Sequence, residues 1–183
     1  QWITETRDVL LKQQNDPSQA WKELSDETVI SKGGATFKQT ENGTWLATGK
    51  NPSSDTYEIR SSLDAKQLGG ILIEALPHKS FKQIGLGRSG NGNFVLTGLD
   101  IRLESKNQKT PPIVLKLDSA EASFAQKDYP PSQILKNASN LTKKNATGWA
   151  VHGFDSSKSK SVRAMFLAKT PIQVPEDAEL VIT

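Results

Sequence analysis

The chain has 183 residues, of which 35% are hydrophobic, and its 23 basic and 20 acidic residues leave a net charge of +3. This length fits one domain, and the small, dispersed charge excess argues against a nucleic-acid partner. The absence of cysteine excludes disulfides, thiolate metal sites and the Cys-x-x-Cys-His motif that attaches c-type haem. No apolar run reaches the ~18 residues of a membrane span.

The first 20 residues differ from the rest. Val9, Leu10 and Leu11 lie inside a polar stretch and predict one short helix that ends near Pro17. No signal peptide is visible and the chain begins at Gln1, so we expect a piece of a longer protein. Residues 1–20 are then a lead-in helix or the tail of a preceding domain, and residues 21–183 form the main module.

From residue 21 onward the apolar residues recur with a period of two, as in half-buried strands. Strands are predicted over 28–31, 35–40, 44–48 and 55–60. Asn42 and Gly43 separate the second strand from the third. Both residue types tolerate positive φ, which predicts a hairpin with a type I′ turn.

The middle of the chain holds the longest apolar runs. Residues 71–76 follow two glycines and end before Pro77, which predicts a central strand. A loop over 78–93 leads to a long strand over 94–103, in which Gly98 is expected to form a bulge.

Further β-prone stretches at 113–117 and 120–124 precede a turn-rich region over 129–144. Closing strands are predicted over 148–151, 163–168 and 178–183. Short strands with frequent turn signals and no alternating helices predict an all-β fold. We expect an antiparallel β-sandwich, of the jelly-roll kind, with one short N-terminal helix.

The stretch from Gly85 to Asn93 has four glycines in nine residues, so its backbone turns tightly or admits a ligand closely. Arg88 offers a fork of donors, and Asn91 and Asn93 offer donors and acceptors, a mixture that suits a hydroxyl-rich ligand. The alternative is a structural loop in which these side chains satisfy nearby backbone groups. The glycine spacing and the strand that follows exclude a dinucleotide fingerprint.

Aromatic side chains provide a second set of candidate ligand contacts. Trp45, Trp149, Tyr57 and Phe81 could stack on sugar rings, because one face of a pyranose is apolar. The alternative for each tryptophan is burial in the core. Trp45 alternates with Leu46, so the two are expected to face opposite sides of their strand.

The two histidines, His78 and His152, are far apart in the sequence and lack a metal-binding spacing. His152 is nevertheless included among the candidate ligand contacts. No Gly-x-Ser-x-Gly elbow is present, and no pair of carboxylates is singled out, which makes a hydrolase the least favoured function. Calcium prefers several oxygen ligands from loops, and Asp55, Asp100 and Asn91 are the candidates for such a site.

Four ordered blocks of the sequence resemble one known module. They are 21–24 with 31–37, 46–52 with 55–57, 73–77 with 85–88 and 91–96, and finally 147–151. These blocks are similar to a domain found in large exported proteins of planctomycete-type bacteria, which carry c-type cytochrome segments and domains of unknown function. The resemblance runs from about Trp21 to the C-terminus. The last block also looks like the equivalent strand of galactose-binding-like, discoidin-type sandwiches.

These resemblances imply a galactose-binding-like jelly roll with ligand loops at one end, in an exported protein, periplasmic or on the cell surface. Many such domains bind sugars, and many hold a structural calcium. The function expected is that of a non-catalytic carbohydrate-binding module that orients a larger protein on a polysaccharide. The alternative is a structural or interaction domain that packs against a cytochrome or catalytic partner domain of the same protein.

Overall fold

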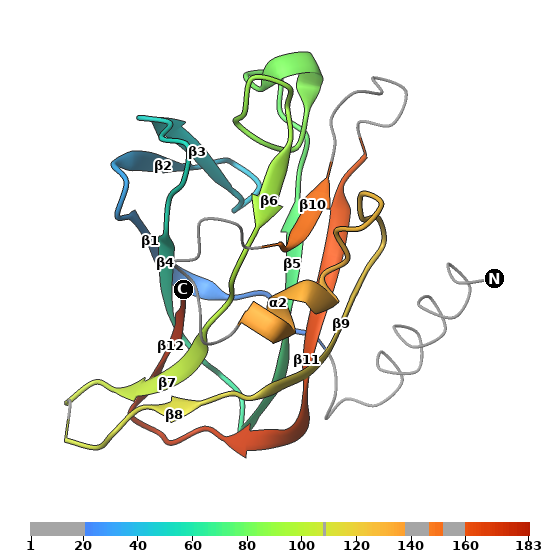
Figure 1. Ribbon diagram of the computed structural model, residues 1–183. Coiled ribbons are helices and arrows are strands. Elements are labelled where there is room, and N and C mark those ends of the chain that lie inside the picture. Colours follow the sequence, from blue (N-terminus) through green and yellow to red (C-terminus); the bar gives the residue numbers. More distant parts are fainter. Residues whose placement is uncertain (1–20, 108, 138–146, 152–159) are drawn as a thin grey trace.

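The computed structural model describes residues 21–107, 109–137, 147–151 and 160–183 (Figure 1). The helix predicted within residues 1–20 and the candidate contact His152 lie outside these residues. Across them the protein is all-β: its strands pair antiparallel in several sheets, and helical structure is limited to two short segments. No helix in the described part of the chain is long and apolar enough to cross a membrane.

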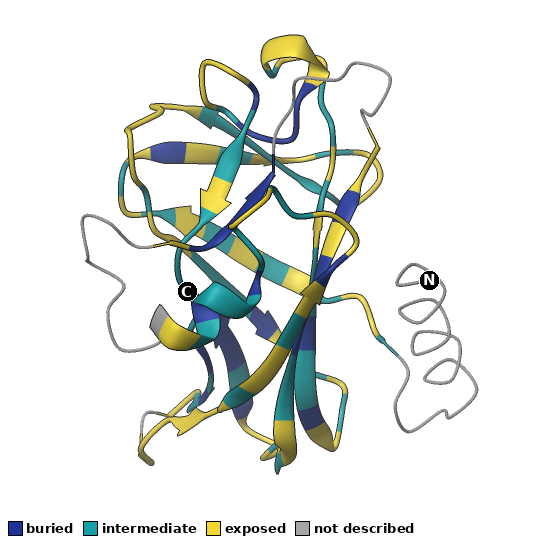
Figure 2. Cartoon of the chain, turned by 45° about the vertical axis from the view of Figure 1, so that its right-hand side comes forward, coloured by how far each residue is buried: buried dark blue, intermediate teal, exposed yellow. Residues whose placement is uncertain are grey.

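The largest sheet has five strands in the order β1-β4-β12-β7-β8. Their bounds are β1 Ser25–Ser31, β4 Tyr57–Ser62, β12 Ala178–Ile182, β7 Ile101–Ser105 and β8 Ile113–Val114. Alternation places Leu180 and Ile182 of the middle strand on the core face, beside Leu103 and Ile101 of β7. Buried and exposed positions alternate along several of the strands (Figure 2), as expected when one face of a sheet is wet.

The second sheet has three strands in the order β5-β11-β9. They are β5 Gln67–Ala75, β11 Val162–Gln173 and β9 Leu117–Ala122. Phe166 of β11 lies in register between Ile71 and Ala120 and has no exposed surface. Residues of this sheet and of the five-stranded sheet belong to one hydrophobic cluster, so the two sheets enclose a common core.

Two smaller strand pairs complete the fold. The hairpin of β2 (Ala35–Gln39) and β3 (Trp45–Gly49) stands beside β1 and β4, and β6 (Phe94–Leu96) pairs with β10 (Trp149–Val151) (Figure 1). The hairpin itself is confirmed, but its turn differs from the type I′ prediction. Gly43 has a φ of 76°, whereas Asn42 is not among the residues with positive φ. The Gly43 N–H donates to the Thr40 carbonyl at 3.0 Å, which is the pattern of a turn closed by a glycine bulge.

Three predictions of secondary structure are wrong in instructive ways. The long strand over 94–103 is two strands in different sheets, because the chain crosses from β6 to β7 over residues 97–100 instead of forming a bulge at Gly98. Strand β5, predicted to be central, is an edge strand. The turn-rich region contains a helix, α2 (Ser132–Asn137), whose Ile134 is buried.

The outer face of the five-stranded sheet carries a network of ion pairs. Arg60 Nη1 lies 2.9 Å from a Glu104 oxygen and 2.8 Å from a Glu179 oxygen, and Arg102 Nε lies 2.8 Å from Glu104. Val181, in register between the two arginines, is fully buried, which indicates that their aliphatic stems cover it. These charges are therefore paired with one another on this face of the sheet.

Candidate functional site

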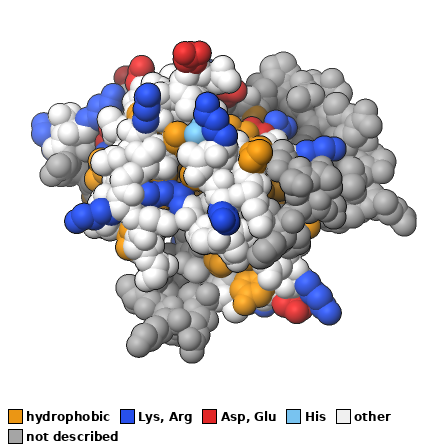
Figure 3. All heavy atoms as spheres, turned by 90° about the horizontal axis from the view of Figure 1, so that it is seen from above, with side chains coloured by type: hydrophobic (Ala, Val, Ile, Leu, Met, Phe, Trp, Pro, Cys, Tyr) orange, Lys and Arg blue, Asp and Glu red, His pale blue; other side chains and the backbone are white. Residues whose placement is uncertain are grey.

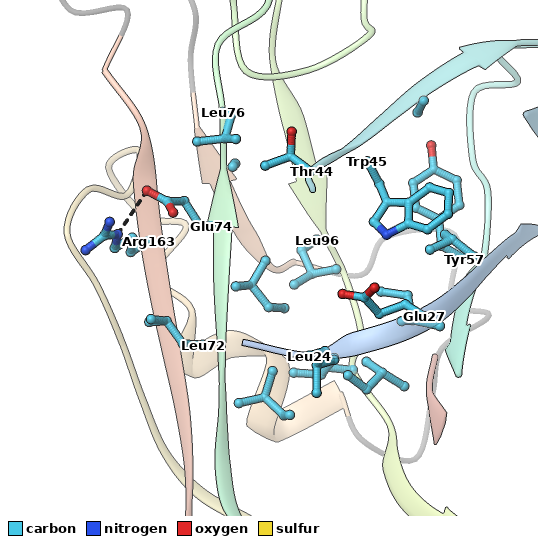
Figure 4. A pocket seen from close by; sticks show the side chains of 18 of the residues that line it. Leu24, Glu27, Thr44, Trp45, Tyr57, Leu72, Glu74, Leu76, Leu96 and Arg163 are labelled. Atoms are coloured by element: carbon cyan, nitrogen blue, oxygen red, sulfur yellow. Dashed lines mark hydrogen bonds and ion pairs between the residues drawn. The ribbon is translucent and has the colours of Figure 1, made fainter. Parts of the chain in front are cut away.

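An open hollow of about 3770 Å³ lies between β5 on one side and β1 with the β2–β3 hairpin on the other (Figure 4). Strands β5 and β1 are edge strands of their sheets, so the sandwich is open here. Pockets for small molecules measure roughly 300–1,000 Å³. The hollow is therefore a trough, suited to an extended ligand rather than to one small molecule.

One wall of the trough carries an aromatic cluster made of Phe37, Trp45 and Tyr57. The rings of Phe37 and Tyr57 meet edge to face, with centroids 4.8 Å apart. Trp45 comes from the adjacent strand, where Phe37 pairs with Ala47 and Gln39 pairs with Trp45. Period-two alternation thus directs Trp45 and Phe37 to the same face of the hairpin. Figure 4 shows the rings of Trp45 and Tyr57 close together in the trough.

Trp45 and Tyr57, two of the aromatic residues proposed from the sequence, differ in their exposure to solvent. Tyr57 is 38% exposed. Trp45 is half-buried, and its indole Nε1 is buried without an acceptor among the described residues. A buried N–H that lacks an acceptor costs free energy, so this wall has a polar group whose partner the described part of the protein does not supply.

The glycine-rich loop lies at the upper end of the molecule (Figure 1), and several of its residues line the trough, of which this end is the rim. Its backbone is folded on itself, because the Leu86 and Gly87 N–H groups both donate to the Gly92 carbonyl, at 3.1 and 2.9 Å. The Asn91 side-chain oxygen accepts from the Asn93 N–H at 3.2 Å. The loop is thus built partly as the structural alternative predicted, and the exposed Asn91 stands at its tip.

Arg88 fastens this loop to the end of β3. Its Nη2 donates to the Gly49 carbonyl at 2.7 Å, and its own carbonyl accepts from Asn51 Nδ2 at 2.8 Å. The other terminal nitrogen, Nη1, is buried and has no partner in the described ranges. Gly49 and Trp45 lie at opposite ends of β3, about 13 Å apart at the usual rise per strand residue. Arg88 and the aromatic cluster therefore lie along one trough without touching the same point.

Asp55 has a structural role next to this site. Its carboxylate accepts from the Ser31 hydroxyl and the Gly33 N–H, both at 2.6 Å, and from the Thr56 N–H at 2.8 Å. Burial raises the pKa of the Asp55 carboxyl, but these hydrogen bonds and the charge of Arg88 outweigh it, so the pKa lies below its ordinary value. Asp55 thereby joins the β1–β2 turn to the β3–β4 connection that faces the loop.

The low pKa of Asp55 predicts a pH-dependent contribution to stability. Because the folded-state pKa is below the unfolded value of about 3.9, the contribution is complete above that value and is lost as pH falls through the folded-state pKa. We expect Asp55→Asn to lower the free energy of unfolding by about 1 kcal/mol at neutral pH. The difference from the wild type should shrink below about pH 4.

Urea unfolding at a series of pH values measures this difference. Asp64→Asn is the matched control, since the Asp64 side chain is fully exposed and its carboxylate lies 3.5 Å from Lys22 Nζ. A surface pair of this kind contributes little, so this variant should have little effect. A difference between wild type and Asp55→Asn that persists undiminished in acid would show that the carboxylate charge of Asp55 is unimportant.

Two of the calcium candidates, Asp55 and Asp100, contact other groups of the protein. Both oxygens of Asp55 are used as described, and Asp100 Oδ2 lies 2.7 Å from Arg102 Nη1. Within the described ranges no group of three or more His, Asp or Glu side chains is placed to hold a metal ion. The calcium site at Asp55, Asp100 and Asn91 therefore stays a prediction.

Trp149 is a core residue, which corrects its assignment as a stacking surface. It is 0% exposed, its Nε1 donates to the Phe124 carbonyl at 2.8 Å, and its ring meets Phe94 edge to face at 5.2 Å. The physical reason is that β10 is buried on both faces, since Trp149, Ala150 and Val151 are all buried. The core alternative therefore holds for this tryptophan.

One Ser–His contact occurs near the start of the loop over residues 78–93. Ser80 Oγ lies 2.7 Å from His78 Nδ1, but the Ser80 backbone N–H also points at this nitrogen, at 3.2 Å. Such a local turn contact is typical of loops, and the ring of Phe81 packs against His78 at 5.8 Å. Among the described residues no carboxylate is hydrogen-bonded to His78, so this pair is not part of a Ser-His-carboxylate triad there.

The structure also adds residues that sequence reasoning missed. Phe37 completes the aromatic cluster, and Glu27 of β1 lies on the same side of the trough, near Trp45 (Figure 4). The hairpin register held the signal for Phe37, because it faces the same way as Trp45 across the Asn-Gly turn. Comparison of the chain with protein-family models, with curated proteins and with solved structures finds no match.

Proposed function

We propose that this protein is a non-catalytic carbohydrate-binding module, with the trough as its binding site. The observation that carries the proposal is the aromatic wall, where Tyr57 is substantially exposed beside the half-buried Trp45. Apolar ring faces for stacking, in the same trough as polar side chains for hydroxyl groups, are what a sugar chain requires. Arg88 and Asn91 add polar contacts at the rim.

The arrangement of sheets supports a galactose-binding-like jelly roll as the finer description of the fold. Among the described residues the two larger sheets hold eight strands, the number expected of a jelly roll. The glycine-rich loop lies at one end of the sheets, where such folds carry ligand loops. By the sequence resemblance, we place the module in a larger exported bacterial protein, periplasmic or on the cell surface.

The proposal predicts that binding depends on the aromatic wall. Tyr57→Ala is expected to weaken retention on a polysaccharide by about tenfold, because aromatic residues at binding hot spots contribute more than about 1 kcal/mol. Tyr57→Phe keeps the ring and should bind nearly as the wild type does. Affinity gel electrophoresis against a panel of soluble polysaccharides measures the effect.

A matched control comes from Phe124, which is 37% exposed but lines a separate, small hollow beside β9. Phe124→Ala removes a similarly exposed ring without touching the trough, so it should leave retention unchanged. The proposal fails if no polysaccharide in the panel retards the wild-type protein, or if Phe124→Ala and Tyr57→Ala weaken binding equally.

A second candidate function is an interaction domain that packs against a cytochrome or catalytic partner domain of the same protein. The observation that favours it is the edge strand β8, whose Ile113 and Val114 are 40% and 49% exposed. Exposed apolar side chains on an open strand edge are suited to contact with another domain. If this is the function, amide hydrogen exchange at Ile113 and Val114 should slow in the longer protein relative to the 183-residue chain.

A further inference from the structure

The rim above the trough is unusually basic for a chain with so small a net charge. Residues 78–93 include His78, Lys79, Lys82 and Arg88 and contain neither Asp nor Glu. Seen from above, Lys and Arg side chains are spread across this end of the molecule, while Asp and Glu side chains lie toward its margin (Figure 3). Positive charge is therefore concentrated at this end of the molecule, although the net charge of the whole chain is only +3.

Backbone contacts bring these cations together from two segments. The Gly85 N–H donates to the Lys82 carbonyl at 3.0 Å, which holds the Lys82 turn against the glycine-rich stretch. The Arg88–Gly49 hydrogen bond places Lys50, the next residue after Gly49, beside the same loop. Lys50, Lys79 and Lys82 are all exposed, so their ammonium groups can reach a ligand on the rim.

Little in the described protein neutralises this charge. The ion pairs found among the described residues do not include Lys50, Lys79 or Lys82. The carboxylate that feels the charge of Arg88 is Asp55, and its oxygens already accept hydrogen bonds from Ser31, Gly33 and Thr56. The exposed rim lysines thus lie outside these ion pairs, and they add positive charge to this end of the trough.

We infer that the ligand of the trough is an acidic polysaccharide, one whose sugars carry carboxylate or sulfate groups. The inference rests on the proposed carbohydrate-binding function and names its substrate class. The chain would lie with its sugar rings against Tyr57 and Trp45 and its anionic groups toward Lys79, Lys82 and Arg88. A neutral chain would leave the rim lysines without any role, whereas a polyanion without sugar rings would leave the aromatic wall unused.

The test compares acidic with neutral polysaccharides, using the 183-residue chain. Affinity gels contain alginate, polygalacturonate, hydroxyethyl cellulose or galactomannan, each at low and at physiological salt. The wild type should be retarded most by an acidic polymer, and added salt should weaken that retention. Lys79→Gln/Lys82→Gln should weaken it by about three- to tenfold, since each exposed charge contact contributes up to about 1 kcal/mol.

Lys116→Gln/Lys127→Gln is the matched control, because both lysines are exposed and lie outside the rim and the change in net charge is the same. Circular dichroism and a melting curve verify that each variant is folded. The inference is supported if only the rim variant loses retention on the acidic polymers. It is overturned if the control loses as much, or if polyglutamate or DNA is bound as tightly as the acidic polysaccharides.

The outcomes also separate this inference from the function on which it rests. Retention on neutral polysaccharides, with no preference for acidic ones and no effect of the rim lysines, overturns the inference and leaves the carbohydrate-binding function standing. Absence of retention on every polysaccharide overturns both.

Discussion

Trp149→Ala should lower the free energy of unfolding by about 3–5 kcal/mol, the usual loss when a buried tryptophan is truncated. The side chain is 0% exposed, packs against Phe94 and donates a 2.8 Å hydrogen bond to the Phe124 carbonyl. Native domains are stable by only about 5–15 kcal/mol, so the variant should unfold at much lower urea concentration. Equilibrium unfolding followed by far-ultraviolet circular dichroism measures the shift.

Two further variants separate packing from hydrogen bonding and core from site. Trp149→Phe retains a ring against Phe94 but loses the hydrogen bond, and should cost about 1–3 kcal/mol. Trp45→Ala removes a tryptophan that is only half-buried and whose Nε1 has no acceptor among the described residues. It should therefore lower the free energy of unfolding less than Trp149→Ala does, and weaken retention on the polysaccharide more. Equal losses of stability in Trp45→Ala and Trp149→Ala would contradict the different environments assigned to the two residues.

The contrast between these tryptophans shows where local sequence patterns succeed. Trp45 follows a turn signal, and the β2–β3 hairpin formed as the Asn42-Gly43 signal predicts. Trp149 is followed by Ala150 and Val151, a short apolar run without alternation. Such a run indicates a strand buried on both faces, so the signal for burial was present.

Other features depend on partners that are distant in sequence, and local patterns do not specify them. Residues 94–103 read as one strand because both halves are β-prone, but Asp100 pairs with Thr183 through two 2.8 Å hydrogen bonds. This pairing draws the second half into the five-stranded sheet. Likewise β5 is apolar on both faces, although it is an edge strand, because residues of both its faces, Leu72 and Ile73 among them, line the trough.

The helix α2 was missed for a different reason. Pro130 and Pro131 read as turn residues, yet proline is favoured at the start of a helix, where its missing N–H costs nothing. Their carbonyls accept from the Gln133 and Ile134 N–H groups, both at 3.0 Å. The buried Ile134 then anchors the helix on the core, a tertiary contact that overrides the local turn signal.

The sequence predicted which residues contribute to the candidate site, but not how they are arranged in space. Arg88, Asn91, Asn93, Trp45 and Tyr57 all line the trough. Residue type and loop composition were enough to select them. Their alignment along β3 follows from the Arg88–Gly49 contact, which joins residues 39 positions apart and has no local signature. The basic rim is partly visible in the sequence, since residues 78–93 hold Lys79, Lys82 and Arg88. Lys50 joins them only through the contact between Arg88 and Gly49.

Gly87→Ala should disrupt both the rim loop and ligand binding. A Cβ at this position would lie 2.1 Å from the Asn93 carbonyl oxygen and 2.4 Å from its carbon. Both are backbone atoms, so the loop itself must move. Overpacking of this kind costs about 1–3 kcal/mol, and displacement of the backbone would carry Arg88 away from Gly49. We expect a lower melting temperature and at least about a tenfold loss of retention on the polysaccharide.

Gly90→Ala is a matched control within the same loop, because a Cβ there meets nothing within 4 Å and Gly90 is not among the glycines with positive φ. It changes the same residue type three positions away and should leave stability and retention as in the wild type. If Gly87→Ala lowers the melting temperature but binds normally at low temperature, the loop shapes the fold without contacting the ligand. In that case the polar half of the site must be sought along β1 and β5, since the aromatic wall alone would then account for binding.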